Sequence, residues 1–238
     1  MCVFDGKAFH TFAKGLNKPF DDLLIETMQE TTKYLCENIQ GCKLGYTQSD
    51  EISLLLTDYE KLTTDAWFDY GVQKMVSVSA SMATLAFNRI FREKCESFRN
   101  KQIKILRSVS EEKFQYGSLL PNKYDKALFD SRAFSIPKEE VTNYFWWRQQ
   151  DCTKNSVSML AQSQFSHKQL QNKNGSAMQD MLMLEKGINW NDLETFKKRG
   201  TCVIKKQEII NEITRNKWFI DKEIPIFSKN SEYIENKV

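Results

Sequence analysis

The sequence predicts an α+β fold, in which a ferredoxin-like domain over residues 1–136 precedes a mainly helical region with a small β-hairpin over residues 137–238. Two observations predict it. Up to residue 136 the hydrophobic patterns follow the order strand, helix, strand, strand, helix, strand, which is the split β-α-β arrangement. Beyond Pro137 the apolar residues recur mainly at helical spacing.

The first strand and helix have clear boundaries. Met1 to Asp5 is a short strand that ends at an Asp-Gly pair, which favours a turn. Pro19 and the acidic residues Asp21 and Asp22 then favour a helix start, because proline and carboxylates suit the first turn. Gly41 ends this helix. Its apolar positions have helical spacing: Leu24, Met28, Leu35 and Ile39.

The next elements complete the first domain. Residues 43–48 and 52–57 predict two strands joined by a turn at 48–51. Residues 72–94 predict a second helix, and residues 128–136 a fourth strand. One face of the second helix carries small residues, which indicates close packing on the sheet: Ser79, Ala83 and Ala86.

The second region is predicted to be mainly helical. Lys138 to Phe165 has the pattern of one long helix or of two shorter ones. Shorter helical pieces follow. Thr201 to Lys205 and Trp218 to Ile226 predict a C-terminal hairpin.

Composition excludes several classes of protein. The chain has 238 residues, of which 41% are hydrophobic and 27% charged, as in ordinary soluble proteins. No apolar run approaches the ~20 residues that span a bilayer, and no signal-peptide pattern opens the chain. None of the six cysteines forms a Cys-x-x-Cys pair, so the sequence indicates neither a zinc site nor a disulfide framework. We expect a cytoplasmic protein that does not bind membranes.

Acidic residues lie at two strand ends that the fold brings together. Asp5 ends the first strand, and Asp50 and Glu51 lie at the tip of the following hairpin. The first and third strands of a split β-α-β sheet are neighbours, so these carboxylates should converge. Two carboxylates and the Gly6 carbonyl suit magnesium, and two such ions ~4 Å apart activate a hydroxyl and stabilise a leaving oxygen. Each motif alone also fits turn chemistry, but both at the required strand ends favour a metal site.

Cations accompany these carboxylates, as a triphosphate substrate requires: Lys7, Lys14, Lys18, Lys74 and Arg132. Lys18 precedes Pro19 at the predicted helix start, and a lysine beside a helix N-terminus favours phosphate binding. Each of these residues also fits the alternative of a solvated surface cation. His10 fits either a base-stacking or a packing role.

Together these residues resemble the tRNA-histidine guanylyltransferase superfamily. The matching segments cover nearly the whole chain: Asp5-Gly6-Lys7-Ala8-Phe9-His10, Lys18-Pro19, Gln48-Ser49-Asp50-Glu51, Lys74, Phe129-Asp130-Ser131-Arg132, Trp147-Arg148-Gln149-Gln150-Asp151, Asn155-Ser156, Ser166-His167-Lys168 and Gly200-Thr201-Cys202. The resemblance implies a polymerase-type palm with two Mg²⁺ ions and a C-terminal region that holds tRNA. It also implies a two-stage reaction, in which ATP or GTP activates the RNA 5′-monophosphate and the 3′-hydroxyl of an incoming nucleoside triphosphate then attacks it.

The resemblance also implies roles for individual residues. The metal ligands are expected to be Asp5, Asp50 and the Gly6 carbonyl, and Glu51 joins the two aspartates as a catalytic group. The nucleotide-binding residues are expected to be Asp5, Gly6, Lys7, Ala8, Phe9, His10, Lys18, Ser49, Asp50 and Lys74. The RNA-binding residues are expected to be Arg132, Arg148, Lys154, Asn155 and Lys168, although charged residues of this kind also form ordinary solvated faces.

Two departures from the family pattern bear on the reaction. Eukaryotic guanylyltransferases carry His-Ile-Asn-Asn-Leu-Tyr-Asn after an Asp-Cys pair, whereas Asp151-Cys152 is followed here by Thr153-Lys154-Asn155-Ser156. The chain therefore resembles the branch of bacteria, archaea and viruses that copies a template to repair truncated tRNA 5′ ends. Val3 occupies the position of a family arginine, so we expect one phosphate contact to be missing.

The sequence thus predicts a magnesium-dependent nucleotidyltransferase that adds nucleotides in the 3′-to-5′ direction to tRNA and uses ATP, GTP or other nucleoside triphosphates. Alternatives are single-guanosine addition to tRNA-histidine, another two-metal palm enzyme such as a nucleotide cyclase, and a non-catalytic RNA-binding relative. The resemblance further implies a homo-oligomer, commonly a tetramer.

Overall fold

A six-stranded sheet with the strand order β4-β1-β3-β2-β5-β6 organises the computed structural model, which describes residues 1–104, 111–210 and 213–237. The strands are β1 (Cys2–Gly6), β2 (Cys42–Gln48), β3 (Glu51–Leu56), β4 (Phe129–Ala133), β5 (Thr201–Ile210) and β6 (Ile213–Asp221). β1 pairs antiparallel with both β3 and β4, and β3 pairs antiparallel with β2. The predicted split β-α-β order is confirmed.

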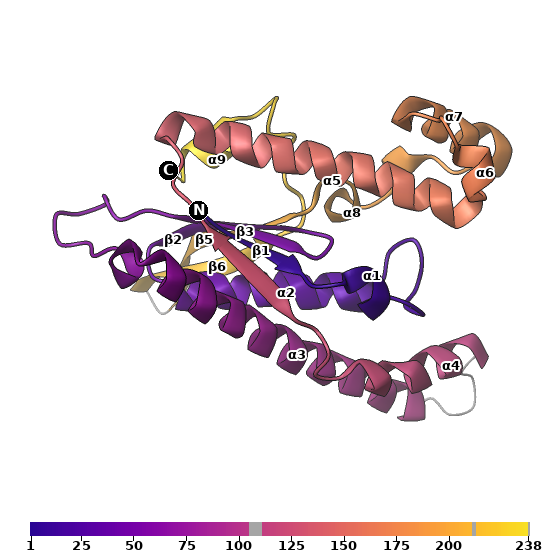
Figure 1. Cartoon of the computed structure of the whole chain (residues 1–238), viewed down its shortest axis with the longest axis horizontal. Coiled ribbons are helices and arrows are strands. Elements are labelled where there is room, and N and C mark those ends of the chain that lie inside the picture. The colour runs from indigo at the N-terminus through magenta and orange to yellow at the C-terminus, as the bar shows by residue number, and fades with distance from the viewer. Residues whose placement is uncertain (105–110, 211–212, 238) are drawn as a thin grey trace. The chain divides into compact units, whose positions relative to one another are not determined.

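Two long helices, α2 (Asp22–Asn38) and α3 (Val72–Lys104), cover one face of this sheet (Figure 1). α2 begins where predicted, because the Asp21 carboxylate accepts the Leu24 N–H at 2.9 Å and so caps the first turn. α3 continues beyond its predicted end at residue 94. Its apolar face runs on through the charged stretch, since Cys95 is buried and Phe98 packs against the core.

Short helices complete the first part of the chain: α1 (Phe9–Phe12), η1 (Trp67–Tyr70), α4 (Glu111–Leu119) and η2 (Leu120–Lys123). α1 is held by a cluster of five aromatic rings beneath the sheet. Neighbouring ring centroids lie 5.1 to 5.8 Å apart in Phe9, Phe12, Phe87, Phe91 and Phe129. Gly6 is required next to this cluster, because a Cβ at this position would lie 2.3 Å from the Phe9 ring.

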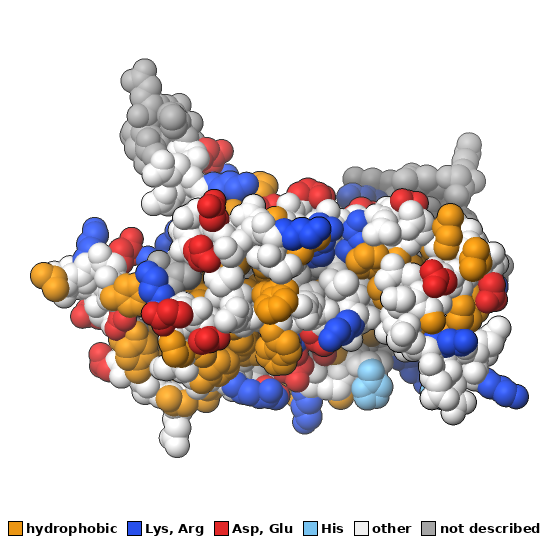
Figure 2. Space-filling view, turned by 90° about the horizontal axis from the view of Figure 1, so that it is seen from above, with side chains coloured by type: hydrophobic (Ala, Val, Ile, Leu, Met, Phe, Trp, Pro, Cys, Tyr) orange, Lys and Arg blue, Asp and Glu red, His pale blue; other side chains and the backbone are white. Residues whose placement is uncertain are grey.

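The remaining helices belong to the second half of the chain: η3 (Lys138–Glu140), α5 (Val141–Gln164), α6 (His167–Leu170), α7 (Gly175–Lys186), η4 (Trp190–Asp192), α8 (Thr195–Arg199) and α9 (Glu232–Glu235). α5 is one continuous helix and packs against α7 and α8. The exposed hydrophobic side chains of α7 include Met183 and Leu184. Figure 2 shows hydrophobic side chains at several places on the face that it presents. No helix in the described ranges combines the length and apolar character needed to cross a membrane.

The chain divides into two compact units, and each unit is made of several separate segments of the sequence. The first unit contains Met1–Leu16, the described residues of Asp21–Ser135, and those of Val203–Ile220. The second contains Asn17–Phe20, Ile136–Cys202 and the residues from Asp221 onward. We predicted a single boundary at residue 136, with the hairpin on its C-terminal side. The hairpin strands β5 and β6 instead extend the sheet of the first unit beside β2.

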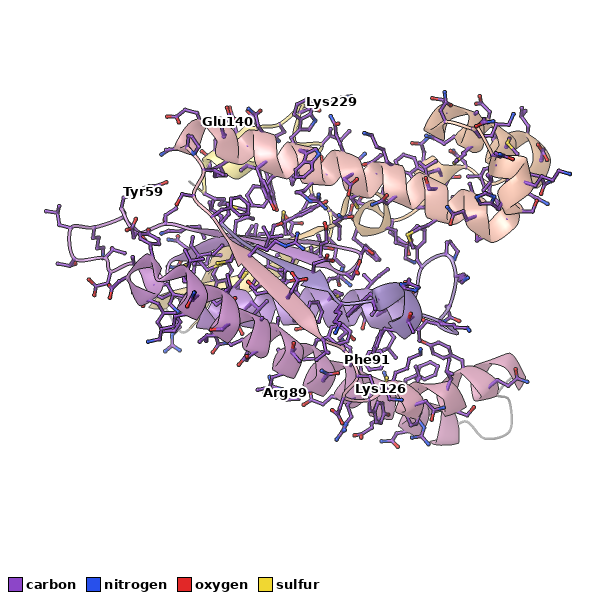
Figure 3. All side chains as sticks on the ribbon, viewed as in Figure 1. Tyr59, Arg89, Phe91, Lys126, Glu140 and Lys229 are labelled. Atoms are coloured by element: carbon purple, nitrogen blue, oxygen red, sulfur yellow. The ribbon has the colours of Figure 1, made fainter. Side chains whose placement is uncertain are left out.

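The aromatic cluster gives a stability prediction. Phe91 is fully buried on α3, whereas Arg89, two residues earlier, is exposed (Figure 3). Phe91→Ala should lower the free energy of unfolding by about 3–5 kcal/mol, because the lost ring leaves a cavity among its neighbours. Arg89→Ala loses a contact with the Tyr34 ring and should cost less than about 1 kcal/mol. Urea titrations of both variants would measure the difference, and equal costs would contradict the packing described here.

Candidate active site

The end of β1 meets the tip of the β2–β3 hairpin through the main chain. The Gly6 N–H donates to the Asp50 carbonyl at 3.1 Å, and Asp5 lies directly opposite Glu51 in the β1–β3 register. Asp5 and Asp50 therefore converge at one end of the sheet, as the strand order predicted.

Local hydrogen bonds orient the acidic side chains of the hairpin tip. Ser49 adopts a left-handed backbone conformation, with φ of 51°, and its hydroxyl donates to the Asp50 carboxylate at 2.9 Å. The Gln48 side-chain amide donates to the Glu51 carboxylate at 2.8 Å. The turn residues Gln48 and Ser49 thus orient the carboxylates of Glu51 and Asp50. The same residues therefore form the turn and the candidate site.

A row of polar residues crosses four strands at this end of the sheet. Gln48, Glu51, Asp5 and Asp130 are direct cross-strand partners in neighbouring strands, so their side chains share one face. Arg132 lies two residues along β4 on the same face, 3.6 Å from the Asp130 carboxylate and 3.9 Å from that of Asp5. The sequence reasoning missed Asp130 as a site residue. Asp130 and Arg132 are two residues apart in the predicted strand, so the sequence already placed both side chains on one face of the sheet.

Burial raises the pKa of the Asp50 carboxyl, and the nearby Asp5 charge raises it further, while the hydrogen bond from Ser49 acts in the opposite direction. Two carboxylates held together in this way attract a cation. Within the described ranges, no three His, Cys, Asp or Glu side chains form a group that would hold a metal ion. A magnesium ion here would take its other ligands from carbonyl, water or phosphate oxygens, which is common for this ion.

The loop after β1 leads into α1. The Lys7 N–H donates to the Leu128 carbonyl at 2.8 Å, and Ala8 adopts a left-handed conformation, with φ of 55°, before the helix. Lys7 and Ala8 are exposed, and so is His10, whose ring lies 3.0 Å from the Thr11 hydroxyl. The Phe9 ring is in the core, so Phe9 offers only its main chain to a nucleotide.

The other two predicted nucleotide-binding lysines are Lys74 and Lys18. Lys74 is in the first turn of α3, which follows β3 and η1 in the chain, whereas Asp50 precedes the start of β3. Figure 1 shows the start of α3 and the α1 segment after Asp5 at opposite ends of the sheet. The structure therefore does not bring Lys74 together with the carboxylates. Its amine lies 4.5 Å from the centre of the Phe68 ring. Lys18 is exposed and belongs to the second unit, so its role stays a prediction.

The predicted RNA-binding residues differ in their surroundings. Lys154 and Asn155 on α5 are exposed, as is Lys168 on α6. Arg148 is buried, lies 3.3 Å from the Asp151 carboxylate and stacks over the Trp147 ring. The Arg148 side chain therefore packs within the second unit and does not lie open on the surface, as a phosphate-tracking cation would.

Comparison with models of known protein families identifies the family of this chain. The model of the family described as "Thg1: tRNAHis guanylyltransferase" matches residues 1–137, more than half of the chain. The chain belongs to the tRNA(His) guanylyltransferase family. It is therefore a nucleotidyltransferase, as the sequence predicted.

Curated relatives resemble the chain along most of its length. It is 28% identical to the tRNA(His) guanylyltransferase of Debaryomyces hansenii, over 87% of this chain and 74% of that protein. The uncharacterized protein R259 of Acanthamoeba polyphaga mimivirus is also 28% identical, over 98% of this chain and 78% of that protein.

Solved structures of the family share the fold. A bacterial tRNA(His) guanylyltransferase-like protein, solved in complex with ATP, superposes with a TM-score of 0.83 at 49% identity, and covers 100% of this chain and 88% of that one. A complex of such a bacterial protein with GTP gives a TM-score of 0.77 at 45% identity, over 99% and 87% of the two chains. The Saccharomyces cerevisiae enzyme, at 20% identity and a TM-score of 0.62, shows the same fold.

The raised pKa of Asp50 in this nucleotidyltransferase predicts a pH-dependent effect on stability. A carboxyl with a higher pKa in the folded chain binds more protons when folded, so its ionisation lowers the free energy of unfolding as pH rises. Asp50→Asn removes this ionisation and keeps an acceptor for Ser49. With EDTA present, we expect the variant to have a higher Tm than wild type at pH 7.5, with a difference that shrinks towards about pH 4.

Thermal unfolding followed by circular dichroism at several pH values would measure this effect. Glu37→Gln, at an exposed position of α2, is the matched control and should show no comparable gain. A lower Tm for Asp50→Asn at pH 7.5 would contradict the unfavourable burial of the Asp50 charge.

Proposed function

We propose that this nucleotidyltransferase adds nucleotides in the 3′-to-5′ direction to the 5′ end of tRNA, copying the opposite strand, after a nucleoside triphosphate activates the 5′-phosphate. The observation that carries the proposal is the convergence of Asp5 and Asp50 beside a loop with exposed Lys7 and His10. The ATP and GTP complexes of similar bacterial proteins support nucleoside triphosphates as substrates.

The site residues divide the chemical work. Asp5, Asp50 and the Gly6 carbonyl would hold magnesium, which supplies charge stabilisation at the transferring phosphoryl group and lowers the pKa of an attacking hydroxyl. Ser49 holds the Asp50 carboxylate in place by its hydrogen bond. Arg132 is exposed on the same face as Asp5 and offers a guanidinium to phosphate oxygens, a group that binds them in bidentate fashion.

The second unit offers groups for the RNA. Lys154, Asn155 and Lys168 are exposed on α5 and α6 and would contact RNA phosphates, which supply most of the affinity in such complexes. All six cysteines are free and buried, which agrees with the cytoplasm as the site of the reaction. A homo-oligomer is part of this proposal, and the tetramer is the common form in the family.

Templated addition is the test of this function. The histidine that follows the Asp-Cys pair in eukaryotic guanylyltransferases is absent after Asp151-Cys152. We therefore expect a 5′-monophosphorylated tRNA lacking its first nucleotide to be extended by the complement of the opposing 3′-side base, in the presence of ATP, Mg²⁺ and all four labelled nucleoside triphosphates.

Four tRNAs that differ only in that opposing base would give the readout on sequencing gels. Guanosine added regardless of the base would replace this proposal with single-guanosine addition to tRNA-histidine. Label at the RNA 3′ end, or nucleotide turnover that does not need RNA, would overturn 5′ addition altogether.

The metal site is tested by separate variants. Asp5→Ala and Asp50→Ala should each lower the single-turnover rate of 5′ extension at least ~100-fold, because charge stabilisation at the transferring phosphoryl group is lost. Circular dichroism should show an intact fold. Glu37→Ala, an exposed carboxylate on α2, should keep the wild-type rate. Near-normal rates in both aspartate variants would remove Asp5 and Asp50 from the catalytic site.

A further inference from the structure

The loop that carries the proposed nucleotide-binding residues is too short to fold by itself. α1 has only four residues, and isolated helices of this length are unstable, because nucleation costs more than a single turn recovers. Its N-cap, Ala8, forms no side-chain hydrogen bond to the helix. Phe9 and Phe12 anchor one side of α1 in the core. Contacts from elsewhere in the chain must fix its main chain.

A buried lysine caps the end of α1. Lys123 lies at the end of η2, is 8% exposed, and its ammonium donates to the carbonyls of Phe12 and Lys14, the latter at 2.8 Å. The ammonium also lies 5.5 Å from the centre of the Phe12 ring. Carbonyls at a helix C-terminus carry partial negative charge, so a cation there stabilises the helix.

Burial of this lysine requires an explanation, because lysines are almost never buried without partners. Burial lowers the pKa of Lys123, and the Lys126 charge lowers it further, while Asp21 acts in the opposite direction. An apolar side chain of similar length would fill the same space without this cost. The benefit that the lysine adds is its hydrogen bonds to the main chain of the α1 loop.

The chain just after Lys123 holds the other end of the same loop. The Asn88 side chain on α3 forms two hydrogen bonds with the main chain of Ala127, donating to its carbonyl at 2.9 Å and accepting its N–H at 3.1 Å. The next carbonyl, that of Leu128, accepts the Lys7 N–H at 2.8 Å. By holding Ala127, Asn88 thus fixes the neighbouring Leu128 carbonyl, which accepts the hydrogen bond from the first residue of the loop.

We propose that residues Lys123–Leu128 form a brace that holds the loop Lys7–Lys14 in the shape that binds the nucleotide, with Lys123 and Asn88 as positioning residues. The brace contacts the loop at both ends, through Lys123 and through Leu128. Neither positioning residue contacts the nucleotide itself. The proposal rests on the proposed function, because that function assigns the nucleotide to this loop.

Hydrogen exchange would test the brace directly. Lys123→Met keeps the length of the side chain and removes its donors, so the amides of residues 9–14 should exchange about tenfold faster, while those of β3 stay near wild type. Lys229→Met is the matched control. It removes an exposed lysine that lies outside the brace (Figure 3) and should leave loop exchange unchanged. Lys123→Arg, which keeps donors, should restore much of the protection.

Nucleotide kinetics would test the consequence. In Lys123→Met the KM for ATP in the activation step should rise about tenfold while kcat changes less than about twofold, because a loosened loop loses preorganisation for binding. Asn88→Ala should likewise raise the KM for ATP with little change in kcat, because it loosens the other end of the loop. This second variant keeps the test decisive if Lys123→Met does not fold. A merely structural role would lower stability and leave the KM for ATP unchanged.

The outcomes separate the two proposals. Unchanged loop exchange in both Lys123→Met and Asn88→Ala would overturn the brace. Faster exchange with an unchanged KM for ATP would overturn its role in nucleotide binding. If wild type shows no saturable use of ATP, the proposed function fails and the nucleotide part of the brace fails with it, whereas the exchange data still decide whether residues 123–128 hold the loop.

Discussion

The antiparallel pairing of β1 with β3 is the constraint on which the candidate active site depends. It brings the end of the first strand to the tip of a hairpin far along the chain, and the bond from the Gly6 N–H to the Asp50 carbonyl closes this junction. The aromatic cluster beneath the sheet supports it, since Phe9 follows Gly6 into the core and only glycine leaves room for that ring. The geometry of the candidate site and the packing of the core therefore depend on the same few residues.

This junction places like charges together, and the cost of doing so is visible in the raised pKa of Asp50. A chain selected only for stability would not bury a carboxylate beside another one. In the proposed function a magnesium ion would make this arrangement favourable, because its positive charge neutralises the two carboxylates. Three neighbouring side chains reduce the repulsion between the carboxylates of this site. Ser49 donates a hydrogen bond to Asp50, and Gln48 donates one to Glu51. The positive charge of Arg132 lies near Asp5.

Sequence reasoning predicted what depends on strand order and missed what depends on distant contacts. The order of elements was enough to place Asp5 beside Asp50, because neighbouring strands follow from the split β-α-β topology. The same topology places the start of α3 at the far end of the sheet, yet motif matching grouped Lys74 with the carboxylates. Nothing local marks Lys123 as a buried lysine, since its acceptors are main-chain carbonyls more than a hundred residues earlier.

The path of the chain between the two units limits how this protein can be divided. The sheet of the first unit is completed by β5 and β6, which follow the whole of α5 to α8 in the sequence. A fragment that stops near residue 136 would keep both aspartates but leave β2 as a bare edge, open to pairing with another copy. Residues 1–136 therefore do not form a domain that can be transferred by itself. Gene fusion or recombination at that point would pass on the two aspartates without the strands that cover the β2 edge and so protect the sheet from aggregation.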